Sequence, residues 1–198
     1  MILENTPALQ TSQLLLRRFE PEDAPALFEL LQDQQVNRFL PWFALTTLDQ
    51  AQAFLQERFL DTYQNPSGYR YAVCLKSDNR PIGYVWKSNG ESRDFGYALA
   101  RPFWRQGIAT QAAAAVLDRV RQAGYPYVTA THDRCNPRSG AVMRRLGMRY
   151  CYSYVEQWQP KNIPVTFRLY QINFDGDHTH PYMQYWHQYP EHFIEPGL

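Results

Sequence analysis

The sequence lacks the features that would direct a chain to a membrane or out of the cell. No run of about 18 apolar residues is present, which is the length that a helix needs to cross a bilayer. Residues 1–13 hold no basic stretch followed by an apolar one, so we expect no signal peptide. The three cysteines, Cys74, Cys135 and Cys151, are odd in number and far apart, which disfavours a disulfide framework. We therefore expect a cytoplasmic protein with no membrane partner.

An excess of charge of either sign is also missing. The chain has 20 Lys and Arg against 19 Asp and Glu, a net charge of +1, so no broad basic field is available to attract nucleic acid. Its 198 residues, 44% of them hydrophobic, suffice for one globular domain with a real core. We expect residues 1–198 to form that single domain, as a monomer or a homodimer, with residues 175–198 as an aromatic C-terminal tail.

Hydrophobic patterning and turn residues predict elements in the order β, α, α, β, β, β, α, β, α, β, β. The expected strands cover residues 14–19, 69–75, 82–87, 95–100, 126–131, 148–158 and 165–174, and the expected helices cover residues 21–34, 48–63, 108–123 and 139–147. Most neighbouring strands should form antiparallel hairpins, whereas the strand–helix–strand segment 95–131 implies one parallel pair. The predicted fold is therefore α/β, with a mixed, mostly antiparallel central sheet and helices on both faces.

The stretch WRQGIAT at residues 104–110 places a glycine directly before a strong helix former. A helix N-terminus offers unpaired backbone N–H groups and a partial positive charge, which together suit an anion. Gly107 permits unusual backbone angles and a close approach, and Arg105 can add a charge-assisted contact. The stretch is neither a Walker A loop nor a GxGxxG fingerprint. Taken alone, it is equally compatible with an ordinary helix entry.

Its neighbours favour the anion site. The stretch DFGYALARPFW precedes it, and NPRSGAVMRRLGM follows after one strand. With these motifs the sequence resembles the GNAT superfamily of N-acetyltransferases, whose fold is that of the acyl-CoA N-acyltransferases. Gly107 and Ala109 match the family's pyrophosphate signature, with Trp104 in place of its first Gln or Arg.

That Trp is common in the branch that resembles ribosomal-protein N-terminal alanine and serine acetyltransferases. The branch patterns are matched by Leu9, Thr11, Leu14, Leu16, Arg17, Asn136, Ser139, Leu146 and Gly147. Gln111 departs from the branch, which often has Glu there. The resemblance extends over roughly residues 9 to 173.

The resemblance implies acetyl transfer from acetyl-CoA to a primary amine by direct attack. It places Ala98, Leu99 and Ala100 along the pantetheine and Asn136 on its arm. It places Ser139 near the thioester sulfur. The pyrophosphate would be held by Arg105, Gln106, Gly107, Ile108, Ala109 and Thr110.

The chemistry that such a site needs follows from acidities. An α-amine has a pKa of about 8 and a lysine about 10.4, so deprotonation at pH 7 costs about 1.4 or about 4.6 kcal/mol. A weak base acting through water therefore suffices for an α-amine, and Asp94 is our candidate, with Glu91 as the second. A backbone N–H near Leu99 can stabilise the oxyanion, and Ser139 can protonate the leaving thiolate. The alternatives are that the two carboxylates are solvated turn residues and that Ser139 is the N-cap of a helix.

Aromatic side chains gather in two further places. The cluster FLPWF at 39–43 lies where the resembled family has its acceptor cleft, so Trp42 and Phe43 are candidate cleft residues, with core packing as the alternative. The tail carries Tyr182, Tyr185, Trp186, Tyr189 and Phe193 at helical spacing after Pro181, which favours packing on the domain's own core over a cleft wall or an interface. The run DGDHTH at 175–180 lacks a distant ligand set, so we expect a solvated loop and no metal.

The acceptor stays open at this point. A protein or peptide N-terminal amine is our first hypothesis, and a small-molecule amine, such as a polyamine or an antibiotic, is the second. A non-catalytic CoA-binding module is the third. The charge of the cleft separates the first two, because carboxylates favour a polyamine and a narrow neutral cleft favours a peptide terminus.

Overall fold

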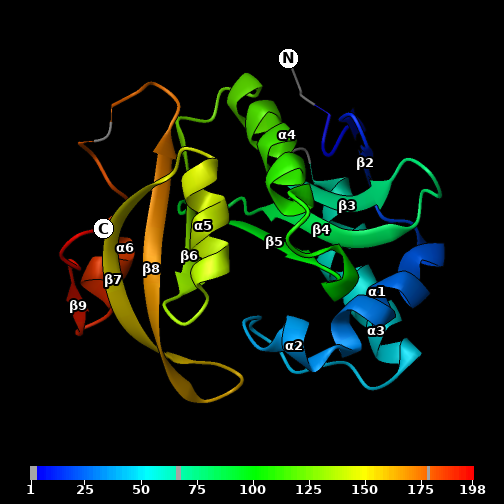
Figure 1. The fold of residues 1–198 in the computed structure, drawn as a ribbon, viewed down its shortest axis with the longest axis horizontal. Coiled ribbons are helices and arrows are strands. Elements are labelled where there is room, and N and C mark those ends of the chain that lie inside the picture. Colours follow the sequence, from blue (N-terminus) through cyan, green and yellow to red (C-terminus); the bar gives the residue numbers. More distant parts are fainter. Residues whose placement is uncertain (1–3, 66–67, 178) are drawn as a thin grey trace.

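A computed structural model describes residues 4–65, 68–177 and 179–198, which form two antiparallel sheets flanked by helices (Figure 1). The first sheet has the order β1-β2-β3-β4-β5, and the second has the order β6-β8-β7-β9. The strands are β1 Leu9–Gln10, β2 Leu14–Arg17, β3 Tyr69–Leu75, β4 Pro81–Lys87, β5 Phe95–Leu99, β6 Tyr127–Asp133, β7 Arg149–Trp158, β8 Ile163–Asn173 and β9 His192–Phe193. The helices are α1 Ala24–Gln32, α2 Gln34–Asn37, α3 Leu48–Arg58, α4 Ile108–Gln122, α5 Pro137–Arg145 and α6 Gln184–Gln188.

Helices cover both faces of the first sheet, which confirms the predicted α/β class. One core lies between α4 and the strands and includes Leu14, Tyr71, Val85, Phe95 and Val116. A second core on the opposite face packs α1 and α3 against the sheet and includes Leu27, Leu31, Leu55, Cys74 and Tyr84. The period-two alternation of β3 and β4 produces this division, because successive side chains of a strand point to opposite faces.

The second sheet is covered by the C-terminal tail. Its core includes Tyr152, Tyr154 and Leu169, with Tyr185 and Trp186 of the tail packed against them. This confirms that the tail packs on the chain's own core. The helical spacing expected through Phe193 is wrong beyond α6, because the chain turns extended at Tyr189 and pairs β9 with β7.

Several other boundaries differ from the sequence expectations. The helix expected over residues 48–63 ends at Arg58 and is followed by a 3₁₀ turn at Leu60–Gln64, and the strand expected over residues 14–19 ends at Arg17. The single helix expected over residues 21–34 is a 3₁₀ turn at Pro21–Asp23 followed by α1. Helix α1 ends at Gln32, because the Asp33 side chain accepts the Gln35 N–H at 2.8 Å and caps the separate helix α2. The helix expected from residue 139 starts at Pro137. Its N-cap is Asn136, so Ser139 is not the N-cap.

The expected parallel pair is reduced to one β-bridge. β5 and β6 meet at a single parallel bridge between Asp94 and Thr129, and beyond it the strands belong to separate sheets. The central sheet is therefore split in two.

Candidate active site

The outer edge of β5 opens toward the second sheet. The Ala100 N–H donates to the Ile82 carbonyl of β4 at 2.8 Å. Because successive N–H groups of a strand face opposite edges, the Leu99 N–H faces away from β4, on the side where the sheets separate. Of the three residues expected along a pantetheine chain, Leu99 is thus the one with a backbone donor directed to the split.

The N-terminus of α4 is the place where the sequence predicts an anion site. Gly107 has a φ of 77°, which is the left-handed region that favours glycine, and no side chain caps the helix. A Cβ built on Gly107 would meet nothing within 4 Å, so the space beside the first turn is open. Arg105 and Gln106 are exposed, and the Gln106 amide donates to the Pro102 carbonyl at 2.8 Å, which braces the turn. This geometry fits a pyrophosphate, because the 15-residue helix presents its positive end to open space.

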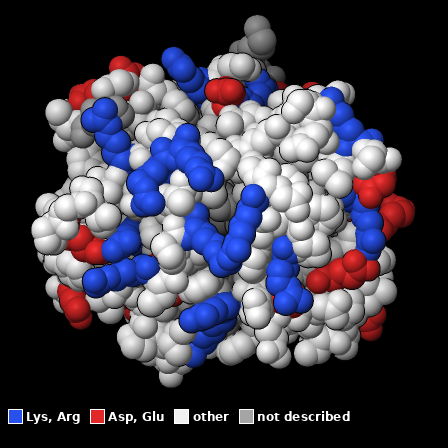
Figure 2. Space-filling model, viewed as in Figure 1, with Lys and Arg blue, Asp and Glu red and all other residues white. Residues whose placement is uncertain are grey.

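Positive side chains gather around this turn. Figure 2 shows Lys and Arg concentrated over α4 and α5, while the acidic side chains of that view lie mostly at its periphery. Arg105 before α4 and Arg138, Arg144 and Arg145 on α5 are all exposed. The face that would receive a phosphate-bearing ligand is therefore locally basic, although the whole chain is near neutral.

A pair of hydroxyl groups links β5 to α5. The Tyr97 hydroxyl donates to the Ser139 carbonyl at 2.9 Å and lies 3.0 Å from the Ser139 Oγ. Burial raises the pKa of Tyr97, so its hydroxyl keeps its proton at neutral pH. The Asn136 side chain accepts the Ser139 N–H at 3.4 Å, which orients the first turn of α5. Both hydroxyls lie on the α4 and α5 side of β5.

Asp94 lies just before β5, with its side chain on the opposite face from the core residue Phe95. Its Oδ1 atom is buried and has no hydrogen-bond partner among the described residues. Burial raises the pKa of this carboxyl to about 7. Its backbone N–H donates to the Ser88 Oγ at 2.9 Å, which closes the turn between β4 and β5.

Burial raises the pKa values of Tyr154 of the second sheet and of Tyr182 and Tyr185 of the tail, which lie near enough to Asp94 for its charge to raise them further. Burial, with a further contribution from the Asp94 carboxylate, raises the pKa of Tyr185 to about 12. The tail is anchored by Glu195, which accepts from Arg168 Nε at 2.9 Å and from the Ser153 hydroxyl at 2.7 Å. The aromatic tail thus packs on the core of the second sheet and also places Tyr185 near Asp94.

Glu91, the second candidate base, lies in a different environment. It is exposed on the turn between β4 and β5, and its backbone carbonyl accepts the Tyr127 hydroxyl at 2.7 Å. Asp94 is therefore the more enclosed of the two carboxylates.

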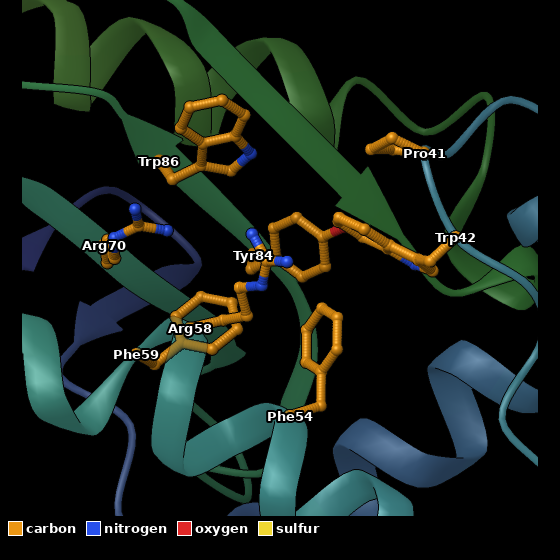
Figure 3. A pocket seen from close by; sticks show the side chains of 8 residues that line it. All are labelled: Pro41, Trp42, Phe54, Arg58, Phe59, Arg70, Tyr84 and Trp86. Carbon is orange, nitrogen blue, oxygen red and sulfur yellow. The ribbon is translucent and has the colours of Figure 1, made fainter. Parts of the chain in front are cut away.

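A cavity of about 250 Å³ lies between α3 and the outward face of β4 (Figure 3). It is lined by Pro41, Trp42, Phe54, Arg58, Phe59, Arg70, Tyr84 and Trp86. Trp42, one of the two expected cleft residues, is among them. Phe43, the other, is 62% exposed and does not line the cavity. The described lining holds two arginines and no carboxylate. The cavity is therefore basic, and it matches neither the acidic cleft expected for a polyamine nor the neutral cleft expected for a peptide terminus.

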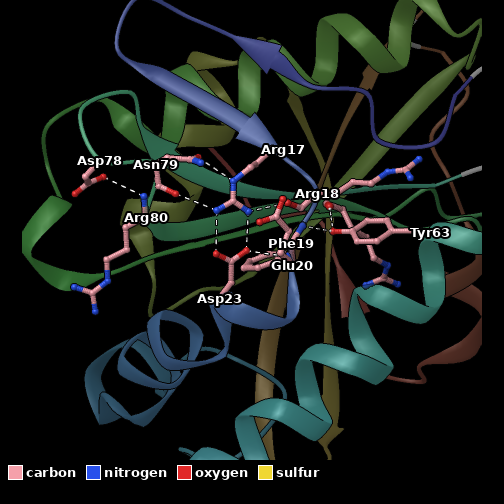
Figure 4. Close-up of polar contacts among 10 residues, drawn as sticks. Arg17, Arg18, Phe19, Glu20, Asp23, Tyr63, Asp78, Asn79 and Arg80 are labelled. Carbon is pink, nitrogen blue, oxygen red and sulfur yellow. Dashed lines mark hydrogen bonds and ion pairs between the residues drawn. The ribbon is translucent and has the colours of Figure 1, made fainter.

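A polar network near this cavity joins the start of α1 to the first sheet (Figure 4). Arg17 at the end of β2 donates to both carboxylate oxygens of Asp23 at 2.7 and 2.9 Å. The Tyr63 hydroxyl accepts the Phe19 N–H and donates to the Arg70 carbonyl, each at 2.8 Å. The first contact ties the start of α1 to β2, and the second ties Tyr63 to the backbone of Arg70 in β3.

Two kinds of site are not found in the part of the chain that the structure describes. No group of three or more His, Cys, Asp and Glu side chains is placed to hold a metal ion in residues 4–65, 68–177 and 179–198. Residue 178 of the DGDHTH run lies outside the described residues. No helix of the described chain is long and apolar enough to cross a membrane.

A helix N-terminus open to an anion, beside a split between two strands, is compatible with an acyl-CoA N-acyltransferase site. Residues 13–149, more than half of the chain, match the acetyltransferase (GNAT) domain family, and the chain belongs to this family. It is an acetyl-CoA-dependent N-acetyltransferase.

Known proteins agree with this assignment. The uncharacterized N-acetyltransferase YnaD of Bacillus subtilis (strain 168) is 28% identical over 145 residues, which cover 71% of this chain and 82% of YnaD. The structure of RimL, a ribosomal L7/L12 alpha-N-protein acetyltransferase in complex with coenzyme A, has a TM-score of 0.75 at 19% identity over 86% of this chain and 100% of that one. The structure of the microcin C7 self-immunity acetyltransferase MccE, in complex with acetyl-CoA and AMP, has a TM-score of 0.71 at 17% identity. The match covers 82% of this chain and 93% of MccE.

Sequence reasoning missed several residues of the site. Tyr97 pairs with Ser139, which is 42 residues away, and the cavity combines Trp42 with Tyr84 and Trp86 from another element. Tyr97 carried a usable signal, because it directly precedes residues 98–100, which are expected from the sequence to lie along the pantetheine. Tyr84 and Trp86 alternate on β4 like ordinary core residues, so the sequence offers no signal for them.

Proposed function

We propose that this acetyltransferase acts on the α-amine of a protein or peptide N-terminus. The observation that carries the proposal is the partly withdrawn Asp94 carboxylate, whose pKa of about 7 is close to the pKa of about 8 of a free α-amine. A base of this strength can take a proton from an α-amine through one water at neutral pH. A lysine, with a pKa of about 10.4, would need a far stronger base.

The chain's residues divide between the two faces of β5. The N–H groups at the start of α4 and the exposed Arg105 would hold the pyrophosphate of acetyl-CoA, and Leu99 would donate its N–H to the carbonyl oxygen that gains charge. Asp94 would accept the amine's proton on one face. Ser139 and Tyr97 would return a proton to the sulfur on the other face. Acetyl-CoA supplies the activated acetyl group.

The composition of the cavity supports a peptide over a polyamine. Arg58 and Arg70 line it and no carboxylate does among its described residues, so a polycationic acceptor would meet like charge. RimL is described as acting on an α-amine of a ribosomal protein, which is in keeping with the proposal. MccE is described as a microcin self-immunity enzyme, so the shared fold by itself does not select the acceptor.

A thiol-release assay with acetyl-CoA tests the proposal. The acceptors are a peptide with a free N-terminus and no lysine, the same peptide with a blocked N-terminus and one lysine, spermidine, and an aminoglycoside. We expect release with the free N-terminus only. Equal or faster release with the lysine peptide, spermidine or the aminoglycoside would contradict the proposal, as would no release with any amine.

A further inference from the structure

Two residues that line the cavity beside β4 each carry a buried polar atom without a hydrogen-bond partner among the described residues. These atoms are the Trp42 Nε1 and the Tyr84 hydroxyl oxygen. Tyr84 is 2% exposed, and Figure 3 shows its hydroxyl directed toward Trp42 within the cavity. Buried donors in native proteins are almost always paired, so two unpaired donors on residues that line one cavity indicate an acceptor that arrives with a ligand.

Two guanidinium groups at the same cavity also lack a strong partner. Among the described residues, the ion-pair partner of Arg58 is its exposed neighbour Glu57 at 3.3 Å, an arrangement that contributes little. Arg70 lies over the Trp86 ring at 5.7 Å, and no carboxylate is paired with it in the described chain. Burial and then the nearby charge of Arg58 lower the pKa of Arg70. An anion between the two guanidinium groups would relieve this repulsion.

The remaining surfaces of the cavity are aromatic. Phe54 and Trp42 pack edge to face, with ring centroids 4.9 Å apart, and Phe59 and Tyr84 do so at 5.6 Å. A volume of about 250 Å³ suits one or two amino-acid side chains rather than a large ligand. The cavity therefore offers apolar walls for a methylene stem and positive charge for its end.

The cavity lies close to the place where acetyl transfer is proposed. In the β4–β5 pairing, Tyr84 stands opposite Ala98 and Trp86 opposite Gly96. A Cβ on Gly96 would lie 2.4 Å from Trp86 Nε1, so the indole rests directly on β5. Neighbouring strands are about 4.8 Å apart, and an extended peptide advances about 3.3 Å per residue. A peptide whose amine reaches β5 would bring its next one or two side chains to the cavity.

We infer that this cavity is an acceptor subsite that selects a carboxylate side chain at the second or third residue of the peptide, with Arg58 and Arg70 as its specificity-determining residues. The inference rests on the proposed function, because the occupant is the acceptor peptide itself. Arg58 and Arg70 bind the carboxylate, Tyr84 and Trp42 donate to it, and the aromatic rings pack against its stem. Neither arginine takes part in the transfer step.

Matched peptides test the inference in the thiol-release assay. Three peptides differ only in carrying Glu, Gln or Lys at positions 2 and 3. For the wild type we expect kcat/KM to be at least about tenfold higher with Glu than with Gln, and lowest with Lys, in line with one charge-assisted contact. In the Arg58→Gln, Arg70→Gln double variant the Glu-to-Gln ratio should fall to about one. The KM for acetyl-CoA and the rate with the Gln peptide should stay within about threefold of the wild type.

Two further variants separate charge from folding. Arg70→Lys keeps the charge and should restore most of the Glu preference that Arg70→Gln loses. Arg121→Gln, an exposed arginine of α4 on the other side of the first sheet, should leave the preference unchanged. A wild-type ratio near one, or a Glu preference that survives in the double variant, would overturn the inference while leaving the proposed function intact.

A binding measurement covers the case in which no peptide is acetylated. The cavity contains Trp42 and Trp86, so tryptophan emission reports its occupancy. Titration with N-acetylated Glu and Gln peptides should give a Kd at least about tenfold lower for Glu, lost in the double variant. If this difference holds without any turnover, the proposed function fails and the anionic subsite stands. Equal Kd values would overturn the subsite.

Discussion

Two residues of the stretch 104–110 do different work at the scale of single side chains. Trp104 donates its indole N–H to the Leu99 carbonyl at 2.6 Å and so holds the turn onto β5. Gly107, three residues later, adopts the left-handed conformation and leaves the space beside α4 open. Trp104 thus sets the position of the turn, while Gly107 keeps the helix N-terminus accessible.

The first prediction concerns Gly107→Glu. A carboxylate at this position repels phosphate and fills the open space, so we expect the affinity for CoA to fall by about tenfold or more, measured by calorimetry. Gly124→Glu is the matched control, because Gly124 follows the same helix, has a φ of 80° and also has open space around it. Both variants should lose similar stability through backbone strain. Equal losses of CoA affinity in the two variants would contradict pyrophosphate binding at the N-terminus of α4.

The second prediction concerns the hydroxyl pair. Tyr97→Phe and Ser139→Ala should each lower kcat by about tenfold, a modest factor because a thiolate of pKa about 8.5 leaves with little help. The double variant should lose no more than the worse single variant, because both hydroxyls belong to one hydrogen-bonded unit. A kinetic double-mutant cycle measures this. Full additivity of the two losses, or a loss confined to the KM for acetyl-CoA, would contradict a role of the hydroxyl pair in protonating the leaving thiolate.

At the scale of elements, the packing of α5 against β6 depends on Gly140. Gly140 lies on the buried side of α5, where the His132 ring of β6 packs so closely that a Cβ would come within 2.5 Å of His132 Nε2. Burial lowers the pKa of His132, so its ring stays neutral at pH 7. This contact sets the height of α5 above β6, and with it the position of Ser139.

The third prediction follows from that contact. Gly140→Ala should lower the stability by about 1–3 kcal/mol through overpacking, and should weaken CoA binding by moving the first turn of α5. Thermal unfolding and CoA titration measure the two effects. The same substitution should cost less in a His132→Ala background, where the ring is absent. An equal cost in both backgrounds would show that the His132 contact is not the cause.

The fourth prediction tests the clamp between β2 and α1. Asp23→Asn leaves Arg17, whose side chain is 13% exposed, without its carboxylate, so we expect a loss of about 3 kcal/mol in urea unfolding. The exposed pair of Arg80 and Glu29 is the control, and Glu29→Gln should change stability by less than about 1 kcal/mol. Similar losses in the two variants would refute a special role for the buried pair.

At the scale of the whole molecule, local patterns predicted the elements and distant contacts built the site. The alternation of residues 69–75 and 82–87 predicted the hairpin of β3 and β4, and Gly124 marked the end of α4. The parallel β5–β6 pair was overestimated, because the split after the Asp94 bridge depends on how the two sheets pack and leaves no local signature. The aromatic cavity escaped prediction for the same reason, since α3, β3 and β4 each contribute part of it.

Asp94 is the point where the two sheets and the tail meet. It bridges to Thr129 of β6, and its charge reaches Tyr185 of the tail, so its raised pKa is a product of the whole fold. A carboxylate accepts a proton only in its ionised form. If Asp94 is the base, kcat/KM must therefore rise as the pH increases through about 7, in addition to the rise near about 8 from the free α-amine.

The most direct measurement is kcat/KM for an α-amine peptide from about pH 5.5 to about pH 9, for the wild type, Asp94→Asn and Glu91→Gln. We predict two ionisations for the wild type and for Glu91→Gln. Asp94→Asn should lose the ionisation near pH 7 and about 10²–10³ in kcat/KM above it, with its CoA affinity unchanged. An Asp94→Asn variant that keeps the wild-type rate and both ionisations would contradict the account.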